Sequence, residues 1–359
     1  MAGSVFGKQL TMTTWGESHG KGVGVVVDGC PAGLSLSEED IQKYLDRRKP
    51  GQSKFTTMRQ EGDQVEILSG VFEGKTTGTP ISMVIRNQDQ RSRDYGNIMN
   101  VYRPGHADYG FDAKYGFRDY RGGGRSSGRE TIGRVAAGAV ACKLLEHFGI
   151  QVTAYTKSIG PVEIRAEHFS MEEAGNNRLY MPDSDAALEA EAYLEELMAK
   201  KDSAGGIVEC VITGVPAGVG EPVFDKLDAS LAMAVMSIGA VKGFEVGDGF
   251  AAARSTGSVN NDAFYMGPGG QVCKRTNHSG GILGGMSDGS DIIFRAAFKP
   301  TPSIALEQET VNRDGQDVKI GIKGRHDPIV VPRAVVVVEA MAAFTVADLL
   351  LQGRSSRIS

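Results

Sequence analysis

The sequence predicts an α/β (α+β) fold, a β-α-β sandwich in which helices pack between two sheets. Two observations predict it: the chain repeats its order of elements, and a long apolar helix closes each half. These helices, expected at residues 129–147 and 331–352, are apolar nearly all round and would be costly to expose to water. We therefore expect them between the sheets, in one domain that covers residues 1–359.

The internal repeat relates residues 16–150 to residues 203–352, with approximate limits. In each half a valine-rich strand leads into a P-A-G turn, once within residues 18–34 and again within residues 203–219. Three elements then follow in the same order in each half: a helix, a glycine-rich strand pair, and a segment that contains a basic residue, a histidine and an aspartate. The matching helices and strand pairs are residues 38–47 and 223–238, and residues 65–86 and 280–299. Unequal spacings indicate insertions, and the two basic-histidine segments are expected to converge on one cleft.

Individual elements follow from local signals. Val23–Val27 is typical of a buried strand, and Ser37 with Asp40 three residues later predicts the start of the next helix. Residues 86–124 show little periodicity and are expected to form a long functional loop. Between the halves we expect a strand at residues 150–155 and an acidic surface helix at residues 185–201.

Composition limits the possible functions. The net charge of −5 argues against bulk binding to nucleic acid or to an anionic membrane. The longest apolar runs, such as Val335–Val338, are too short to cross a bilayer, and no signal-peptide pattern is present. The four cysteines form no CxxC pair, so neither a disulfide framework nor a zinc site is expected. We therefore expect a cytoplasmic protein with no metal, membrane or nucleic-acid partner.

The stretch from Arg103 to Arg134 predicts a site for a compact polyanion. Between Arg86 and Arg134 there are nine arginines and one lysine, Lys114. Only arginine offers a planar fork that binds carboxylate or phosphate through two parallel hydrogen bonds. The following S-x-x-E pattern marks a helix start, whose free N–H groups and dipole also favour anions.

Simpler interpretations of this stretch stay open. Residues 125–127 could be only a capped helix start beside a flexible loop, and the YRGGGR segment could be an RNA-binding element. The loop Lys299–Ser303, with two prolines and two hydroxyls, is either a phosphate contact or a turn that ends a strand. No G-x-G-x-x-G after a strand and no P-loop sequence occurs, which disfavours those nucleotide-binding folds.

Two histidines are candidates for proton transfer. His19 lies in G-E-S-H-G and His106 in R-P-G-H-A-D, both in glycine-flanked turns. Each could instead be a loop histidine that is hydrogen-bonded to a nearby carboxylate. His278 and His326 stay open. Together with Asp108 and Asp327 the two turn histidines could bind a metal, but no pair has ligand spacing on a helix or hairpin.

Several of these segments resemble the signature segments of the chorismate synthase family, and the resemblance covers essentially the whole chain. They are GESHGKGVGVVVDGCP (16–31), GRSSGRETIGRVAAGAV (124–140) and GRHDP (324–328), together with RPGHAD, GGILGG and KPTPS. The resemblance implies a lyase that converts 5-enolpyruvylshikimate 3-phosphate to chorismate and phosphate, the last step of the shikimate pathway. It also implies a 1,4-anti-elimination that needs reduced FMN, two mainly antiparallel sheets and a homotetramer. A flavin-dependent reductase on the same scaffold is the alternative.

The resemblance also assigns residues. His19 would protonate the departing phosphate, His106 would protonate or stabilise the reduced flavin near N1, and Asp327 would assist proton transfer at N5. The implied substrate residues are Arg48, Lys54, Arg103, Arg129 and Arg325. The implied FMN residues are Arg125, Ser126, Ser127, Gly239, Ala240, Gly284, Lys299, Pro300, Thr301, Pro302, Ser303 and Arg325.

NADPH, if it is used, would meet Arg48 and Lys54. Relatives often carry arginine where this chain has Lys54, which replaces a two-pronged contact by a point charge. Many relatives also have a polar or stiffer residue at the position of Gly239. In its compact length the chain resembles the monofunctional members of the family, which receive reduced FMN from an external flavin reductase.

Overall fold

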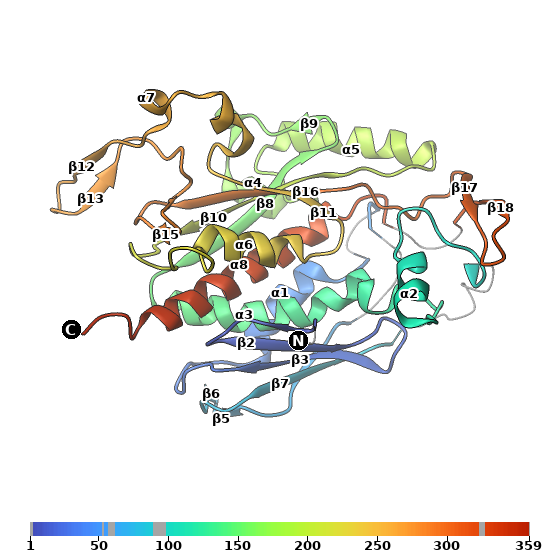
Figure 1. Ribbon diagram of the computed structural model, residues 1–359, viewed down its shortest axis with the longest axis horizontal. Helices are drawn as coiled ribbons and strands as arrows, with labels where there is room; N and C mark the ends of the chain where they lie inside the picture. Colours follow the sequence, from blue (N-terminus) through green and yellow to red (C-terminus); the bar gives the residue numbers. More distant parts are fainter. Residues whose placement is uncertain (1–2, 52–53, 57–61, 89–97, 323–326, 359) are drawn as a thin grey trace.

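Two five-stranded antiparallel sheets enclose the long helices, as Figure 1 shows. The computed structural model describes residues 3–51, 54–56, 62–88, 98–322 and 327–358. The prediction of an α+β sandwich with helices between two sheets is confirmed.

The first sheet has the strand order β1-β2-β3-β7-β4. Its strands are β1 (Val5–Phe6), β2 (Thr11–Gly16), β3 (Gly22–Asp28), β7 (Ile81–Arg86) and β4 (Val65–Ile67). The valine-rich run becomes β3, the central strand, in which Val25 is fully buried and pairs with Thr14 on one side and Met83 on the other. The predicted strand pair is also present, since β4 and β7 pair with each other in antiparallel fashion.

The second sheet has the order β11-β16-β10-β8-β9. Its strands are β11 (Val241–Val246), β16 (Ile292–Phe298), β10 (Gly206–Thr213), β8 (Gln151–Ile159) and β9 (Val162–Glu163). Among the described residues, four small hairpins lie outside these two sheets: β5 (Val71–Phe72) with β6 (Lys75–Thr76), β12 (Phe264–Met266) with β13 (Val272–Lys274), β14 (Ile282–Leu283) with β15 (Met286–Ser287), and β17 (Gln308–Val311) with β18 (Asp317–Ile320).

The central helices are α1 (Glu38–Arg48), α3 (Thr131–His147), α6 (Leu227–Met236) and α8 (Val331–Gly353). The capping box predicted at Ser37 and Asp40 is present at the start of α1. The helices α3 and α8 pack closely at Gly138, where an added Cβ would lie 2.3 Å from Cβ of Ala340. The outer helices are α2 (Asp108–Tyr115), α4 (Met171–Asn176), α5 (Ser184–Ala199) and α7 (Gly257–Asn260).

The helix α8 corrects one expectation. Judged by short apolar runs, the chain had no segment that could span a bilayer, but α8 has 23 residues and contains an 18-residue apolar window with a mean hydropathy of 2.1, enough by length and composition alone. In the fold, 89% of that apolar window is buried between the sheets. Such burial is the behaviour of a core helix.

Two further expectations were partly wrong. The span 86–124 was expected to be irregular, but residues 108–115 form α2, and residues 124–126 form the 3-10 turn η2 (Gly124–Ser126). The closing helix of the first half does not start directly after Ser127. A second 3-10 turn, η3 (Gly128–Glu130), comes first, and the Ser127 side chain accepts a hydrogen bond from the Arg129 N–H.

In chain order the first half gives β3, α1, β7 and α3, and the second half gives β10, α6, β16 and α8. In each half the valine-rich strand pairs with the later strand in antiparallel fashion. The internal repeat stays a prediction that this order supports.

Candidate active site

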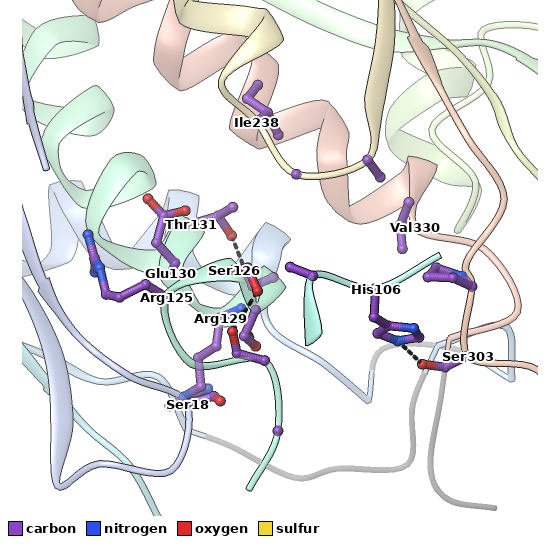
Figure 2. Close-up of a pocket in the computed structure, with 18 of the residues that line it drawn as sticks. Ser18, His106, Arg125, Ser126, Arg129, Glu130, Thr131, Ile238, Ser303 and Val330 are labelled. Atoms are coloured by element: carbon purple, nitrogen blue, oxygen red, sulfur yellow. Dashed lines mark hydrogen bonds between the residues drawn. The ribbon is translucent and has the colours of Figure 1, made fainter. Parts of the chain in front are cut away.

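A cavity of about 1140 Å³ brings together loops from distant parts of the chain. Figure 2 shows His106 and Ser303 on one side of it and Ser126 and Arg129 on the other. Pockets for one drug-sized ligand measure about 300–1,000 Å³, so this cavity is larger than a typical single-ligand pocket. The predicted site residues that line it are His19, Arg48, Arg103, His106, Arg125, Ser126, Ser127, Arg129, Gly239, Ala240, Lys299, Thr301, Pro302, Ser303 and Asp327.

Asp63 joins two of the predicted arginines. Nη2 of Arg48 donates to Oδ2 of Asp63 at 3.1 Å, and Nη1 of Arg129 lies 3.0 Å from Oδ1 of the same carboxylate. All three side chains are buried. Burial lowers the pKa of Arg48 to about 9 against the opposing charge of Asp63, so Arg48 stays protonated at neutral pH. Two cations share one anion here, which leaves a net positive charge for a ligand.

Asp108 forms a second cluster of the same kind. Arg103 donates to both oxygens of Asp108 at 2.8 Å, and Nη1 of Arg118 lies 2.6 Å from Oδ1. Burial opposes ionisation of Asp108, but the hydrogen bonds and the charge of Arg103 outweigh it and lower the pKa to about 2. The carboxylate is therefore ionised, and again one anion is shared by two guanidinium groups.

His106 is held by two hydrogen bonds of 2.9 Å, from Nδ1 to the carbonyl oxygen of Pro104 and from Nε2 to Oγ of Ser303. A carbonyl oxygen can only accept, so Nδ1 carries the proton and Nε2 accepts from the Ser303 hydroxyl. Burial, helped by the charge of Arg103, lowers the pKa of His106 to about 4. The imidazole is therefore neutral at pH 7, with its Nε2 lone pair directed toward the loop after β16.

His19 lies in a β-turn that the N–H of Gly20 closes on the carbonyl oxygen of Glu17 at 3.1 Å. Gly122 packs against its ring, and a Cβ at Gly122 would lie 2.7 Å from Cδ2 of His19. The buried hydroxyl of Ser18 lines the cavity and has no hydrogen-bond partner among the described residues. Two glycine-rich segments far apart in sequence thus place His19 in the cavity wall.

The segment Arg125–Ser127 lines the cavity, but Arg125 directs its guanidinium elsewhere. Its Nη1 donates to the carbonyl oxygen of Gly16 at 3.1 Å, and its Nη2 donates to the hydroxyl of Thr14 at 2.7 Å. The prediction that this guanidinium adds its charge to an anion cradle therefore needs correction. In this structure the side chain fastens the η2 turn to β2, and Ser126 and Ser127 line the cavity beside it.

A turn between α6 and β11 forms another wall. Ala240 has a φ of 74°, a left-handed conformation that is rare outside glycine. Its carbonyl oxygen accepts the N–H of Lys299 at 2.9 Å, and Nη2 of Arg134 donates to the carbonyl oxygen of Ser237 at 3.2 Å. Arg134 and the loop after β16 thus fix a strained turn whose residues Gly239 and Ala240 line the cavity.

Asp327 and Lys299 are two further charged residues in the cavity lining. Oδ2 of Asp327 lies 2.6 Å from Nη1 of Arg333, whose Nε donates to the backbone oxygen of Arg48. Nζ of Lys299 donates to the backbone oxygen of Gly105 at 2.8 Å. Both groups therefore connect the loops of the second half to those of the first half.

Three predicted site residues lie outside the cavity lining, and a fourth lies outside the described residues. Lys54 is exposed and forms ion pairs with Glu191 and Glu195 of α5. Pro300 does not line the cavity, although its neighbours in the loop do. Gly284 lies in the β14–β15 hairpin, before β16, whereas the cavity loop follows β16. Arg325 lies outside the described residues.

Sequence reasoning missed several residues that shape the site. Asp63, Arg118, Arg134 and Arg333 were not singled out, yet each holds a predicted residue or its loop. A buried carboxylate gives no local signal in the sequence. The surplus of arginine over lysine did include Arg118 and Arg134, and it was the only available hint.

The fold and the cavity define a class: a two-sheet sandwich enzyme with an arginine-rich site that suits a polyanion and two histidines in its lining. A family model described as chorismate synthase matches residues 10–351. A chorismate synthase of Agathobacter rectalis is 68% identical over 100% of this chain and 97% of its own length. One of Methanosarcina mazei is 57% identical over 98% of this chain and 97% of its own.

A solved structure described as a crystal structure of chorismate synthase has a TM-score of 0.77 and 34% identity, and covers 98% of this chain and 94% of its own. The chain belongs to the chorismate synthase family. It is a lyase of the shikimate pathway and serves aromatic amino-acid biosynthesis by forming chorismate from 5-enolpyruvylshikimate 3-phosphate. The comparisons support neither the RNA-binding alternative nor the reductase alternative.

Proposed function

We propose that this cavity is the active site, where the phosphorylated substrate undergoes the 1,4-anti-elimination beside bound reduced FMN. The observation that carries the proposal is the convergence of Arg48, Arg103 and Arg129 with His19 and His106 on one cavity. The substrate bears two carboxylates and a phosphate, and guanidinium groups bind both kinds of anion through paired hydrogen bonds.

The charge of the two clusters suits this substrate. Asp63 neutralises one of the two arginines that it holds, so one positive charge remains in that cluster. In the other cluster Asp108 and Asp112 pair with Arg103, Arg118 and Arg313, so the arginines again exceed the carboxylates by one charge. The carboxylates also fix the guanidinium planes before any ligand arrives, which lowers the cost of ordering them on binding. Arg325, which the resemblance adds, would extend this set from outside the described residues.

His19 supplies the proton for the departing phosphate in this proposal. Its turn is closed by a backbone hydrogen bond and its ring packs on Gly122, so the imidazole has one defined position in the wall. Protonation of a leaving oxygen by a positioned imidazole contributes about 10²- to 10⁴-fold in rate. The nearby Ser18 hydroxyl can donate to the same oxygen.

The residues present fit a flavin. The cavity combines apolar surface from Ile238, Val330 and Val337 with the backbone of the strained Gly239–Ala240 turn. Hydroxyl oxygens of Ser18 and Thr301 are buried and have no hydrogen-bond partner among the described residues, as expected for groups that meet a polar ligand. We propose that Ser126, Ser127, Gly239, Ala240, Lys299, Thr301, Pro302 and Ser303 hold FMN. When bound there, reduced FMN would supply an electron-rich ring able to accept a proton, in a reaction that is redox-neutral overall.

His106 and Asp327 act on the flavin side of the proposed site. His106 is neutral in the free cavity, so its Nε2 can take up a proton when an anion binds nearby and raises its pKa. Asp327 is held by Arg333, which also binds the backbone of Arg48. This link between Asp327 and the backbone of Arg48 supports the proposal that the carboxylate assists proton transfer close to the bound substrate.

Lys54, Pro300 and Gly284 have weaker support. Lys54 is exposed and paired with α5 glutamates, so a role in binding substrate or NADPH would require it to exchange those partners. Gly284 lies before β16, whereas the loop that lines the cavity follows β16. The seven residues of this strand (Ile292–Phe298) span about 20 Å, so Gly284 lies far from the cavity loop of its own chain. A contact between Gly284 and flavin would therefore come from a second copy of the chain.

We also propose a homotetramer in the cytoplasm. The β12–β13 hairpin exposes Phe264, Met266 and Val272. An isolated two-stranded hairpin has little stability of its own, so apolar residues on it indicate a surface that another copy covers. An external flavin reductase, using NADPH, would deliver reduced FMN to this compact member of the family.

The test is an anaerobic assay with reduced FMN and 5-enolpyruvylshikimate 3-phosphate, in which chorismate and phosphate are measured. We expect one chorismate per substrate consumed and no net oxidation of NADPH. Consumption of NADPH in step with product would support a reductase, and tight, salt-dependent RNA binding without turnover would support the RNA alternative.

A further inference from the structure

Asn87, which directly follows β7, contacts two parts of the proposed site at once. Its side-chain Nδ2 donates to the carbonyl oxygens of Glu17 (3.0 Å) and Gly20 (2.8 Å). These are the first and last residues of the β-turn that carries His19. Its Oδ1 accepts Nε of Arg129, and its backbone N–H donates to the carbonyl oxygen of Lys21 at 3.1 Å.

The chemistry of these partners fixes the orientation of the amide. A guanidinium only donates hydrogen bonds and a carbonyl oxygen only accepts them, so oxygen must face Arg129 and nitrogen must face the turn. An aspartate of the same shape would direct an anionic oxygen at two carbonyl oxygens, and an alanine would contact neither side. Asparagine is suited to hold both groups from this position.

Arg129 is fixed on its other side as well. Its Nη1 lies 3.0 Å from the buried carboxylate of Asp63, while Asn87 holds Nε. Two contacts at different edges define the plane of the guanidinium. The same amide also holds both ends of the His19 turn, so the position of Arg129 depends on the position of that turn.

We propose that Asn87 is a positioning residue that couples the His19 turn to Arg129 and so keeps the proton donor and a substrate arginine in one geometry. This inference rests on the proposed roles of His19 and Arg129. Asn87 need not touch the substrate. Its contribution is alignment, and misplacement of a reacting group by about 1 Å can cost about 10²-fold in rate.

Two variants separate the two contacts. In Asn87→Asp the carboxylate still accepts from Arg129 but repels the turn carbonyls, so we expect kcat to fall by about 10- to 100-fold with KM changed less than about threefold. In Asn87→Ala both contacts are lost, so kcat should fall similarly and KM for the phosphorylated substrate should rise by about tenfold. The anaerobic assay with reduced FMN measures both constants.

Asn177 provides a matched control. Its Nδ2 also donates to two carbonyl oxygens, those of Glu173 and Met181, and its Oδ1 accepts two backbone N–H groups in a turn that does not line the cavity. We expect Asn177→Ala to lower the thermal midpoint as much as Asn87→Ala but to leave kcat and KM nearly normal. Equal losses of kcat in the two variants would show a general structural role and overturn the proposal.

A double-mutant cycle provides the decisive result. If Asn87 acts through His19, then Asn87→Asp in a His19→Ala background should lower kcat by less than about threefold further. Full additivity, or normal kinetics of both Asn87 variants, would overturn the inference. The proposed function is tested separately, because it fails only if the wild-type chain forms no chorismate under the same conditions.

Discussion

Nη2 of Arg48 lies 3.1 Å from Oδ2 of Asp63, and both side chains are almost completely buried. Because Asp63 also pairs with Arg129, this one carboxylate connects the end of α1 to the η3 turn before α3. The shape of the candidate site therefore depends on a group that itself does not line the cavity.

Removing the charge of Asp63 should destabilise the protein. Asp63 has a φ of 45°, which asparagine tolerates better than most residues, so Asp63→Asn tests the charge with little backbone strain. Breaking a buried ion pair by removing one partner costs about 3–5 kcal/mol. Urea unfolding should show a loss of this size, whereas Asp46→Asn, which removes a partly exposed pair with Lys49, should cost less than about 1 kcal/mol. Similar losses in the two variants would contradict the structural role of Asp63.

Both candidate histidines should be needed for turnover. His19→Ala and His106→Ala are each expected to lower kcat by about 10²-fold or more, as the loss of an acid-base group does. His278→Ala is the control, because His278 pairs with Asp248 outside the cavity lining. We expect this variant to have a normal kcat. Near-normal turnover in either cavity variant would remove that histidine from the mechanism.

Stability should depend on pH through His106. Its pKa in the fold is about 4, below the value of 6.5 for an unperturbed histidine, so the unfolded chain binds the proton first. The contribution of His106 is thus fully present above pH 6.5 and is lost as the pH falls from 6.5 toward 4. Unfolding free energies measured across this range should decline less steeply in His106→Gln than in the wild type. Parallel curves would show that the histidine is not buried in its neutral form.

Gly138 should not tolerate a larger residue. A Cβ there would lie 2.3 Å from Cβ and 2.5 Å from Cα of Ala340, so Gly138→Ala must push α3 and α8 apart. Overpacking of this kind costs about 1–3 kcal/mol or more. Gly175→Ala in α4 is the control, because nothing lies within 4 Å of its Cβ position and alanine favours helix by about 0.5–1 kcal/mol. Denaturant midpoints should move in opposite directions in the two variants.

The exposed hairpin should control assembly. Phe264→Glu combined with Met266→Lys places charges on a surface that the proposed tetramer buries. We expect light scattering to show smaller species, while far-ultraviolet circular dichroism stays unchanged. The control variant Phe224→Glu changes a still more exposed aromatic residue in the loop before α6. A tetramer that survives the hairpin changes would place the interface elsewhere.

Helices and strands that carry a clear local signal were predicted correctly from the sequence. The capping box at Ser37 gave the start of α1, and the valine run gave β3. The helix α2 was missed because its first turn follows a Pro-Gly turn and it has no apolar stripe: the only residue it buries is Asp108. It is stabilised by its tertiary contacts with Arg103 and Arg118, which no local pattern reveals.

In the candidate site, the types of residue were easier to predict than the directions in which their side chains point. The arginine-rich stretch, His19 and His106 do line one cavity. Arg125 was expected to face an anion, yet its guanidinium donates hydrogen bonds to Thr14 and Gly16, more than a hundred residues away in the chain. Which way a loop side chain points depends on the neighbours that the fold supplies, so position in a motif does not determine it.

The helix α8 has a consequence for how the protein is made. It follows in the chain every element against which it packs, including α1, α3, α6, β8 and β10. While residues 331–353 are still being synthesised, both sheets have apolar inner faces without their central filling, and such surfaces favour aggregation and chaperone binding. The newly made segment is itself apolar enough to enter a lipid bilayer. Completion of the core is therefore a late event, which waits until α8 has filled the gap between the sheets.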